Sequence, residues 1–432
     1  MRSKREVIFI STLRIGGFAV LLALLSGSAS AQQALTWDQV KAKFEAANPT
    51  LKADEISVQE MRDQEITAYL RPNPQFTFST DGTQIARRNG VWQPLAGTQY
   101  SPNFSYLHER QHKRELRLES AKEGTQIADS QHEDLERNLI FNLRSVFIQT
   151  LQAKAVLVLA QADLEYYDKI IEISRVRYKD GAIGKIDLDR IELLRVQYET
   201  EIQTAIVNLR TSKIQLLQLL NERIPLDKFD VSGPFEFSDD LQPLEHFHQI
   251  ALDNRPDLRA ALESVQQAIT NHKLADANGS TDPTFGAWYT YNGSFNNPNS
   301  NQTLGLNMSI PLRIFDRNQG EKKRTLIDID RNKELTEAAR AQVFSDVDSA
   351  YEQVQSNIAL LKPYRDQYKD QARRVRDTVT YSYQRGGASL MDFLNAQSDY
   401  RMVQLAYLQL VGTYLTSTSQ LNLAVGHEEI HP

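Results

Sequence analysis

One segment of the sequence has the residue types of a zinc peptidase. Residues 108–112, His-Glu-Arg-Gln-His, fit the pattern His-Glu-x-x-His, in which two histidines one helical turn apart bind zinc and the glutamate acts as general base. Zincin helices lie buried in a cleft, whereas three basic residues, Lys113, Arg114 and Arg117, follow this segment closely. A metallopeptidase is therefore an alternative hypothesis. It predicts a bound metal and an activity that depends on Glu109, and no clear third ligand supports it.

A second pattern with chemical potential occurs twice, at residues 178–188 and 383–393. Both segments read Tyr-x-x-Gly-x-x-small-x-x-Asp-apolar without gaps. Small residues allow a tight chain reversal, while tyrosine hydroxyls and carboxylates can hydrogen-bond between neighbouring helices. Helix capping by the aspartates is the structural alternative. The pattern residues are Tyr178, Gly181, Gly184 and Asp187 in the first segment, and Tyr383, Gly386, Ser389 and Asp392 in the second.

These two segments belong to an internal repeat. They lie 205 residues apart, and the similar segments 48–53 and 255–260 lie 207 residues apart. A third pair of similar segments, at Pro74 and Pro283, is 209 residues apart. Three landmarks in one order at nearly constant spacing indicate that one structural unit occurs twice. The expected organisation is a signal peptide at 1–31, a first repeat at 32–235 and a second repeat at 236–432.

Long helices are expected to dominate each repeat. No proline lies between Pro102 and Pro225, and a row that includes Leu143 recurs every seven residues, as in a coiled coil. A helix over residues 108–179 would be about 105 Å long at its usual rise per residue. Pro363 is expected to kink or break a helix of the second repeat, because proline lacks a backbone donor.

Short segments with an alternating pattern lie between the helices. Aromatic and other apolar residues alternate there with small or polar ones, as in strands that are buried on one face. Residues 292–302 are nearly all Asn, Ser, Gly and Pro, which is typical of an exposed hairpin loop. The predicted strands cover residues 75–80 and 98–106 in the first repeat, and 285–291 and 303–310 in the second.

Composition narrows the class of protein. Basic residues near the N-terminus, an apolar run at 15–25 and the small residues 29–31 predict a secretory signal peptide that is cleaved after Ala31. The formal charge of −6 becomes −9 without this segment, which carries four basic residues and one acidic residue. An acidic chain without a basic run argues against nucleic acid as a partner. The sequence has no cysteine, which excludes disulfides and thiol catalysis. No later stretch reaches 18 apolar residues, so we expect no membrane-spanning helix.

In combination these segments resemble the TolC-like outer-membrane efflux proteins. Residues 71–74, Arg-Pro-Asn-Pro, look like the approach to the first strand of that family. Residues 113–121 resemble the start of its first long helix. Arg-Pro-Asp-Leu at 255–258 and the segment 309–320 are also similar to family sequences. The resemblance covers nearly all of the chain after the signal peptide.

The resemblance implies a fold and an assembly. The expected fold is mainly α with a small β part, in which each of two repeats contributes long coiled-coil helices and two strands. A homotrimer is expected to form a twelve-stranded β-barrel in the outer membrane and an α-barrel in the periplasm. This agrees with a physical requirement, because four strands alone cannot close a barrel without leaving edges.

The resemblance also implies a function. Such a chain is expected to be the passive exit channel of a tripartite, RND-type efflux system, with no catalytic activity and no cofactor. Its implied partners are an inner-membrane transporter that supplies energy and a periplasmic adaptor (membrane fusion protein). Residues 309–320 favour the CzcC-like branch, which serves exporters of heavy-metal cations, with small toxic compounds as the other cargo. The alternatives are an exit duct for type I protein secretion and a soluble periplasmic coiled-coil protein.

Finally, the resemblance assigns roles to the two turns. Four residues fall on gate positions of the family, namely Tyr178, Asp187, Tyr383 and Asp392. Four small residues fall on turns that receive the adaptor, namely Gly181, Gly184, Gly386 and Ser389. The sequence departs from the best-known family pattern, because Ala388 replaces an arginine and Asn395 replaces a second acid. We therefore expect Lys185 or Arg385 to take the place of that arginine, or a more weakly held closed state.

Overall fold

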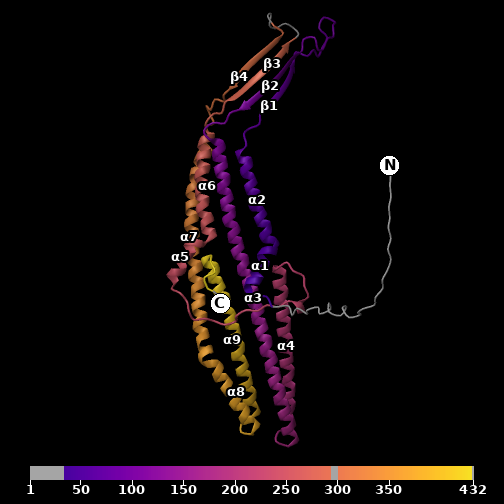
Figure 1. Cartoon of the computed structure of the whole chain (residues 1–432), viewed down its shortest axis with the longest axis vertical. Coiled ribbons are helices and arrows are strands. Elements are labelled where there is room, and N and C mark those ends of the chain that lie inside the picture. Colours follow the sequence, from indigo (N-terminus) through magenta and orange to yellow (C-terminus); the bar gives the residue numbers. More distant parts are fainter. Residues whose placement is uncertain (1–33, 293–299, 431–432) are drawn as a thin grey trace, which may run out of the picture.

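The computed structural model describes residues 34–292 and 300–430, which form one elongated molecule (Figure 1). A small antiparallel sheet forms one end, and long helices run from it to two turns at the opposite end. The mainly α fold with a small β part is therefore confirmed. The predicted signal peptide, residues 1–31, and residues 293–299 of the predicted hairpin loop lie outside the described residues.

The sheet contains the four strands that the sequence predicts. They are β1 (Gln75–Asp81), β2 (Gln99–Leu107), β3 (Thr284–Asn292) and β4 (Gln302–Ser309), and each pairs antiparallel with the next. The central strands β2 and β3 come from different repeats and place Phe104 opposite Ala287. The sheet thus joins the two repeats by backbone hydrogen bonds, while β1 and β4 form its two edges.

The helices of the first repeat include one of unusual length. They are α1 (Trp37–Ala47), α2 (Pro49–Tyr69), α3 (Lys113–Lys179) and α4 (Lys185–Leu219), followed by the 3₁₀ turn Leu226–Lys228. The 67 residues of α3 span roughly 100 Å. Leu143 and Thr150 are buried seven residues apart on α3, and so are Tyr167 and Ser174 further along. This spacing confirms the predicted heptad rows.

The second repeat follows the same order with one interruption. It contains α5 (Leu244–Asn254), α6 (Pro256–Asn278), α7 (Gln319–Pro363), α8 (Lys369–Gln384) and α9 (Leu390–Val425). Between α7 and α8 lies a π-helical turn, Tyr364–Tyr368. The break predicted at Pro363 is confirmed, since the α-helical hydrogen-bond pattern ends at this proline and widens in the next turn.

One predicted boundary is wrong. The long helix of the first repeat begins at Lys113, not at His108. Gln111 and His112 have left-handed φ angles of 59° and 54°, which a right-handed helix cannot contain. The chain therefore leaves β2 through a short irregular segment before α3 begins.

The hydrophobic core is divided along the length of the molecule. One cluster includes Phe44 of α1 with Leu143 and Phe147 of α3. A second cluster packs α5, α7 and α9 together. A third, near the turns, joins the repeats because it holds Tyr167 and Ile191 of the first repeat against Phe393 of the second.

Helix α3 also differs from expectation in its hydropathy. It contains an 18-residue window with a mean hydropathy of 1.3, long and apolar enough to cross a membrane by length and composition. Its existence contradicts the expectation that no later segment would qualify. Only 28% of this window is buried in one chain. One such helix is weak evidence for a membrane span, because a packing helix passes the same test.

Candidate functional site

The two patterned turns lie side by side at the end of the molecule that is opposite the sheet (Figure 1). The first connects α3 to α4, and the second connects α8 to α9. Gly181 and Gly386 have φ angles of +72° and +79°. Other residues rarely adopt this backbone conformation, so the predicted role of these two glycines in tight chain reversal is confirmed.

In the second turn, Ser389 and Asp392 form a capping box at the start of α9. The Ser389 hydroxyl accepts a 3.1 Å hydrogen bond from the backbone N–H of Asp392. The Asp392 carboxylate accepts hydrogen bonds from the hydroxyl and the backbone N–H of Ser389, at 2.7 and 3.1 Å. The hydrogen bond from the Ser389 side chain lowers the pKa of Asp392. The N-cap residue is therefore Ser389, and Asp392 supports the cap from the third helical position.

The first turn has the same spacing but no side-chain cap. Gly184 occupies the N-cap position of α4 and has no side chain to accept a hydrogen bond. Asp187 sits where Asp392 sits in the second repeat, yet its carboxylate makes no hydrogen bond within the described part of the chain. N-capping by the aspartates themselves, the structural alternative from the sequence, is not what either turn shows.

Tyr383 is the most enclosed of the predicted site residues. Its side chain is 4% exposed, and its ring stacks on Phe393 with ring centroids 4.9 Å apart. Burial raises the pKa of Tyr383, and the positive charge of Arg177 opposes that rise. The hydroxyls of Tyr383 and Ser174 are both buried, and the interaction with Ser174 also opposes the rise in the pKa of Tyr383.

Arg177 connects the two turns and was missed by the sequence analysis. Its guanidinium donates a 2.7 Å hydrogen bond to the backbone carbonyl of Tyr383 and lies 4.7 Å from the centre of the Tyr383 ring. Arg385, one of the two expected substitutes for the family arginine, instead lies over the ring of Tyr381 on its own helix. The sequence did contain a signal for a special role of Arg177. The two repeats differ at this position, because the second repeat has Ser382 there.

Tyr178, the counterpart of Tyr383, is 41% exposed. The structure does not bring the two tyrosines together, although both were predicted gate residues. The contacts that hold the first hairpin together lie further from its tip. There Tyr167 stacks on Tyr198 with ring centroids 4.5 Å apart and donates a hydrogen bond to the carbonyl of Ile191. The tip of the first hairpin is therefore held less tightly than its shaft.

Above the turns, cationic side chains lie on tyrosine rings between the helices. The Arg376 guanidinium is 3.9 Å from the ring centre of Tyr400 and 4.7 Å from that of Tyr166. Arg401 lies over Tyr198 and forms an ion pair with Glu201 at 3.0 Å. These contacts join α8 and α9 to the first repeat, so these tyrosine rings serve helix packing.

The zinc-peptidase hypothesis is wrong in its central requirement. His108 and His112 do not lie on one turn of a helix, since α3 begins after both. The His112 side chain is 86% exposed, and the Glu109 carboxylate is held by Arg117 at 2.5 and 2.9 Å. Within residues 34–292 and 300–430, no group of three His, Cys, Asp or Glu side chains is arranged to hold a metal ion.

Comparison with known proteins gives a consistent result. The profile of the family described as outer membrane efflux protein matches residues 248–427. The chain is 22% identical to the outer membrane protein TolC of Escherichia coli K12 over 94% of this chain and 85% of TolC. It is 20% identical to the cobalt-zinc-cadmium resistance protein CzcC of Cupriavidus metallidurans over 82% of this chain and 81% of CzcC. The crystal structure of VceC from Vibrio cholerae superposes with a TM-score of 0.73 and 16% identity, over 91% of this chain and 97% of VceC.

Proposed function

Because this chain is a TolC-like member of the outer membrane efflux proteins, we propose that its two tied turns are the gate of the channel. The protein is an outer-membrane exit channel of a tripartite efflux system, with its helical part in the periplasm, and it is not an enzyme. The observation that carries the gate proposal is the contact of Arg177 with Tyr383 at the end remote from the sheet.

The gate follows from how one chain connects its hairpins. Arg177 joins the last turn of α3 to the last turn of α8, so the two tips move apart only if this contact breaks. Three such chains around one axis would place their exposed turns at a constriction. Asp187 and Asp392 lie in the first turns of α4 and α9, and rings of their carboxylates would favour cations there.

A homotrimer accounts for surfaces that one chain leaves uncovered. Apolar side chains are exposed along one face of α4 at multiples of seven residues, namely Ile186, Leu193, Val207 and Ile214. Such a row is the seam of a coiled coil that lacks its partner helix. At the other end of the molecule, Leu304 and Leu306 on the edge strand β4 are 77% and 83% exposed. Twelve strands from three chains would close the sheet and remove its edges.

The adaptor is proposed to bind the two turns. Gly181, Gly184, Gly386 and Ser389 lie at the connections between helices, at the periplasmic end of the molecule. A passive channel also requires an energy source, which we assign to an inner-membrane transporter. We place the boundary between the two repeats at residues 235 and 236, in the segment between α4 and α5.

The proposed cargo is metal cations or small toxic compounds. The likeness to CzcC, a cobalt-zinc-cadmium resistance protein, supports cations, and so do the exposed carboxylates of the turns. Deletion of the gene should raise sensitivity to cobalt, zinc or cadmium, and the full-length gene should restore resistance. If the deletion leaves metal sensitivity unchanged but raises sensitivity to dyes or drugs, the cargo is small toxic compounds.

The gate is testable because the chain has no cysteine of its own. The Asp392→Cys variant, purified from the outer membrane as a trimer, would be placed in a planar bilayer and treated with a cationic thiol reagent. We expect the single-channel conductance to fall, while the cysteine-free wild type stays unchanged. Full modification by mass spectrometry with unaltered conductance would remove residue 392 from the permeation path. Recovery as a soluble monomer would contradict the channel itself.

A further inference from the structure

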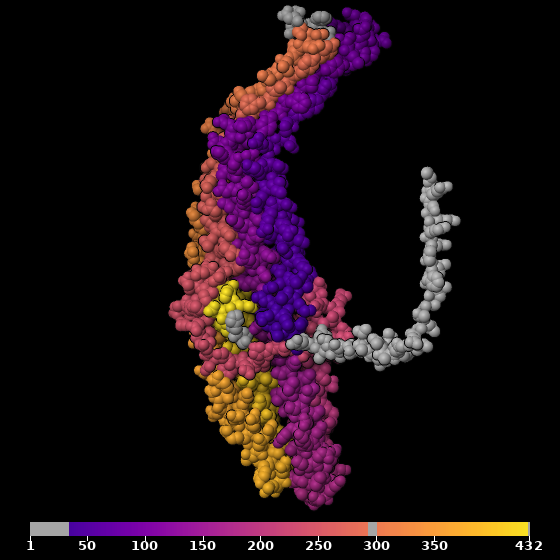
Figure 2. Space-filling model, viewed as in Figure 1, coloured from indigo at the N-terminus to yellow at the C-terminus, as the bar shows by residue number. Residues whose placement is uncertain are grey.

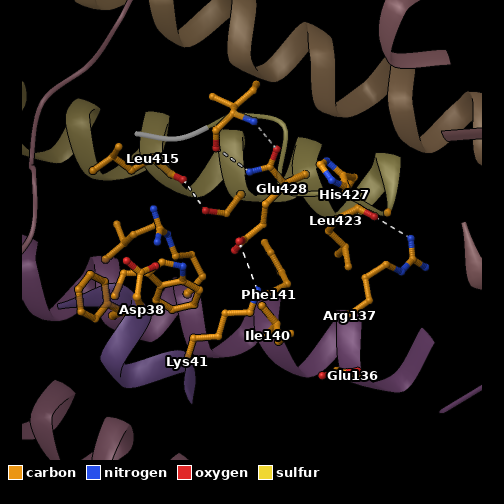
Figure 3. Close-up of a pocket in the computed structure, with 18 of the residues that line it drawn as sticks. Asp38, Lys41, Glu136, Arg137, Ile140, Phe141, Leu415, Leu423, His427 and Glu428 are labelled. Atoms are coloured by element: carbon orange, nitrogen blue, oxygen red, sulfur yellow. Dashed lines mark hydrogen bonds and ion pairs between the residues drawn. The ribbon is translucent and has the colours of Figure 1, made fainter. Parts of the chain in front are cut away.

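A cavity of about 950 Å³ lies midway along the molecule, where α1 and the end of α9 flank α3 (Figure 3). Figure 2 shows the N-terminal helix and the C-terminal segment side by side at this level. The cavity lies between the lateral edges of the chain, which are formed by α4 on one side and by α5 and α7 on the other (Figure 1). A second copy that packs edge to edge would therefore leave its mouth open.

The walls of the cavity combine aromatic and other apolar side chains with charged ones. Trp37 of α1 and Phe141 and Phe147 of α3 line it, with Leu415 and Leu423 of α9 across from them. The rings of Trp37 and Phe147 meet edge to face, with centroids 5.6 Å apart. The volume falls in the usual range for a small-molecule site.

One cation inside the cavity has no anionic partner. The Arg144 guanidinium lies 4.3 Å from the centre of the Trp37 ring and makes no hydrogen bond or ion pair with any described residue. Burial lowers the pKa of Arg144, and the negative charges of Glu428 and Asp38 oppose this fall only in part. Nearby, Arg137 donates to the carbonyl of Leu423 and pairs with Asp134, but its Nε is buried without an acceptor. The donors of Arg144 are thus available to an anion in the cavity, whereas Nε of Arg137 is enclosed by protein.

Most other charged residues of the lining are paired or lie at the rim, whereas Glu45 and Glu136 are half-buried and form no ion pair with a described residue. Lys41 of α1 pairs with Glu428 of the C-terminal segment at 3.3 Å, across the cavity (Figure 3). Arg259 pairs with Glu133. The acids Asp38 and Asp253 are exposed at the edge. Arg144 is therefore a cation without a hydrogen-bonding partner among the described residues that lies next to aromatic rings, in a lining that also carries acids.

We propose that this cavity binds an organic anion, a carboxylate or sulfonate carried on an aromatic body. The anionic group would accept hydrogen bonds from Arg144. The ring would pack against Trp37 and Phe147. This binding is separate from the gate, which lies at the far end of the helices.

Trp37 supplies a direct readout. The sequence contains three tryptophans, so a Trp92→Phe/Trp288→Phe variant of the full-length protein leaves Trp37 as the reporter. Titration with 1-naphthylacetate in a nonionic detergent is expected to change its fluorescence and saturate. Arg144→Gln should weaken binding roughly 10- to 100-fold, the range expected for a charged hydrogen bond. Arg210→Gln, an exposed arginine on α4, is the matched control and should bind like the parent.

Matched probes test the charge and the shape of the ligand. The cationic analogue 1-naphthylmethylammonium should bind much more weakly, and octanoate should bind more weakly than the aromatic acid. Equal binding of the anionic and cationic probes, or equal binding by the parent and Arg144→Gln, would overturn the proposal. Stronger binding of octanoate than of the aromatic acid would show that the ligand is a lipid-like acid and not an aromatic solute. If Arg144→Gln does not fold, the parent protein is tested for competition between a sulfonate and the carboxylate probe. An absence of competition would also overturn the proposal.

Discussion

The two turns at the helical tips share one sequence pattern but are held differently. Tyr383 in the second turn is 4% exposed and stacks on Phe393, whereas Tyr178 in the first is 41% exposed. Ser389 caps the helix after the second turn, whereas Gly184 provides no cap after the first. The pattern fixes the reversal of the chain in both, but the neighbouring side chains decide how firmly each tip is held. The first turn is therefore the more easily moved part of the proposed gate.

The largest expected difference is between the two tyrosines. Tyr383→Ala should destabilise the second tip by about 3 kcal/mol, because it removes a buried ring. Tyr178→Ala should change stability by no more than about 0.5 kcal/mol, because its ring is half exposed. Hydrogen exchange of backbone amides in the last turn of α8 and of α3 measures each effect. Similar losses in both variants would show that the asymmetry of the tips has no energetic meaning.

Next in size is the contact between the tips. Arg177→Gln should weaken it by about 1–3 kcal/mol, since a charged hydrogen bond and a cation–π contact are lost. Single-channel conductance should rise. Arg385→Gln is the matched control, because that guanidinium stacks only on Tyr381 of its own helix. A larger rise in conductance in the Arg385→Gln variant would show that Arg385, which the sequence suggested, holds the two tips together instead of Arg177.

The difference between the two N-cap residues can be tested by removing the cap from one turn and adding one to the other. Ser389→Ala should destabilise the start of α9 by about 1 kcal/mol. Gly184→Ser should stabilise the start of α4 by up to about 1 kcal/mol, because its extended backbone suits an N-cap and Asp187 is in position to complete a capping box. Amide exchange in the first turns of α4 and α9 reports both changes. Destabilisation by Gly184→Ser would mean that the first turn requires glycine for a reason other than flexibility.

A further expected effect depends on pH and involves both hairpins. Burial raises the pKa of Asp163 on α3 to about 6, and the nearby Arg401 and Arg376 only partly oppose this. Because the pKa is raised in the packed state, the stabilising contribution is complete below the ordinary value of 3.8 and is lost as the pH rises through about 6. After correction for the intrinsic pH dependence of exchange, amides near the tips should thus be better protected at pH 5 than at pH 7.5.

Asp163→Asn should remove most of this dependence, because the amide stays neutral at both pH values. The exposed Asp189 on α4 provides the control, and Asp189→Asn should retain the wild-type response. A pH response that persists unchanged in Asp163→Asn would assign it to another group.

Much of the architecture was predictable because it depends on local and periodic signals. The four strands, the long helices and the break at Pro363 follow from alternation, heptad spacing and the chemistry of proline. The positive φ angles of Gly181 and Gly386 follow from the turn pattern. Each of these features is determined by residues that are close together in the sequence.

The tertiary contacts of the site were not predictable in the same way. Tyr178 and Tyr383 occupy equivalent positions, yet burial of the second depends on Phe393 and Arg177, which reach it from two different helices. The His-Glu-x-x-His pattern failed because two left-handed residues delay the start of α3. In both cases the outcome depends on how separate elements meet, which spacing within one element does not encode.

The π-helical turn after Pro363 determines the rotational phase of the tip. On α7, Val354 and Leu361 are buried seven residues apart, and the next inward position, Lys369, follows after eight. From there the spacing of seven resumes, and the inward residues meet a row of aromatic rings on α9: Lys369 on Tyr407, Arg376 on Tyr400 and Tyr383 on Phe393. Without the extra residue, the row would continue through Tyr368 and Val375, which are now about half exposed. The turn after the proline thus determines which face of α8 meets α9. A single-residue deletion in this turn would rotate α8 by about 100°.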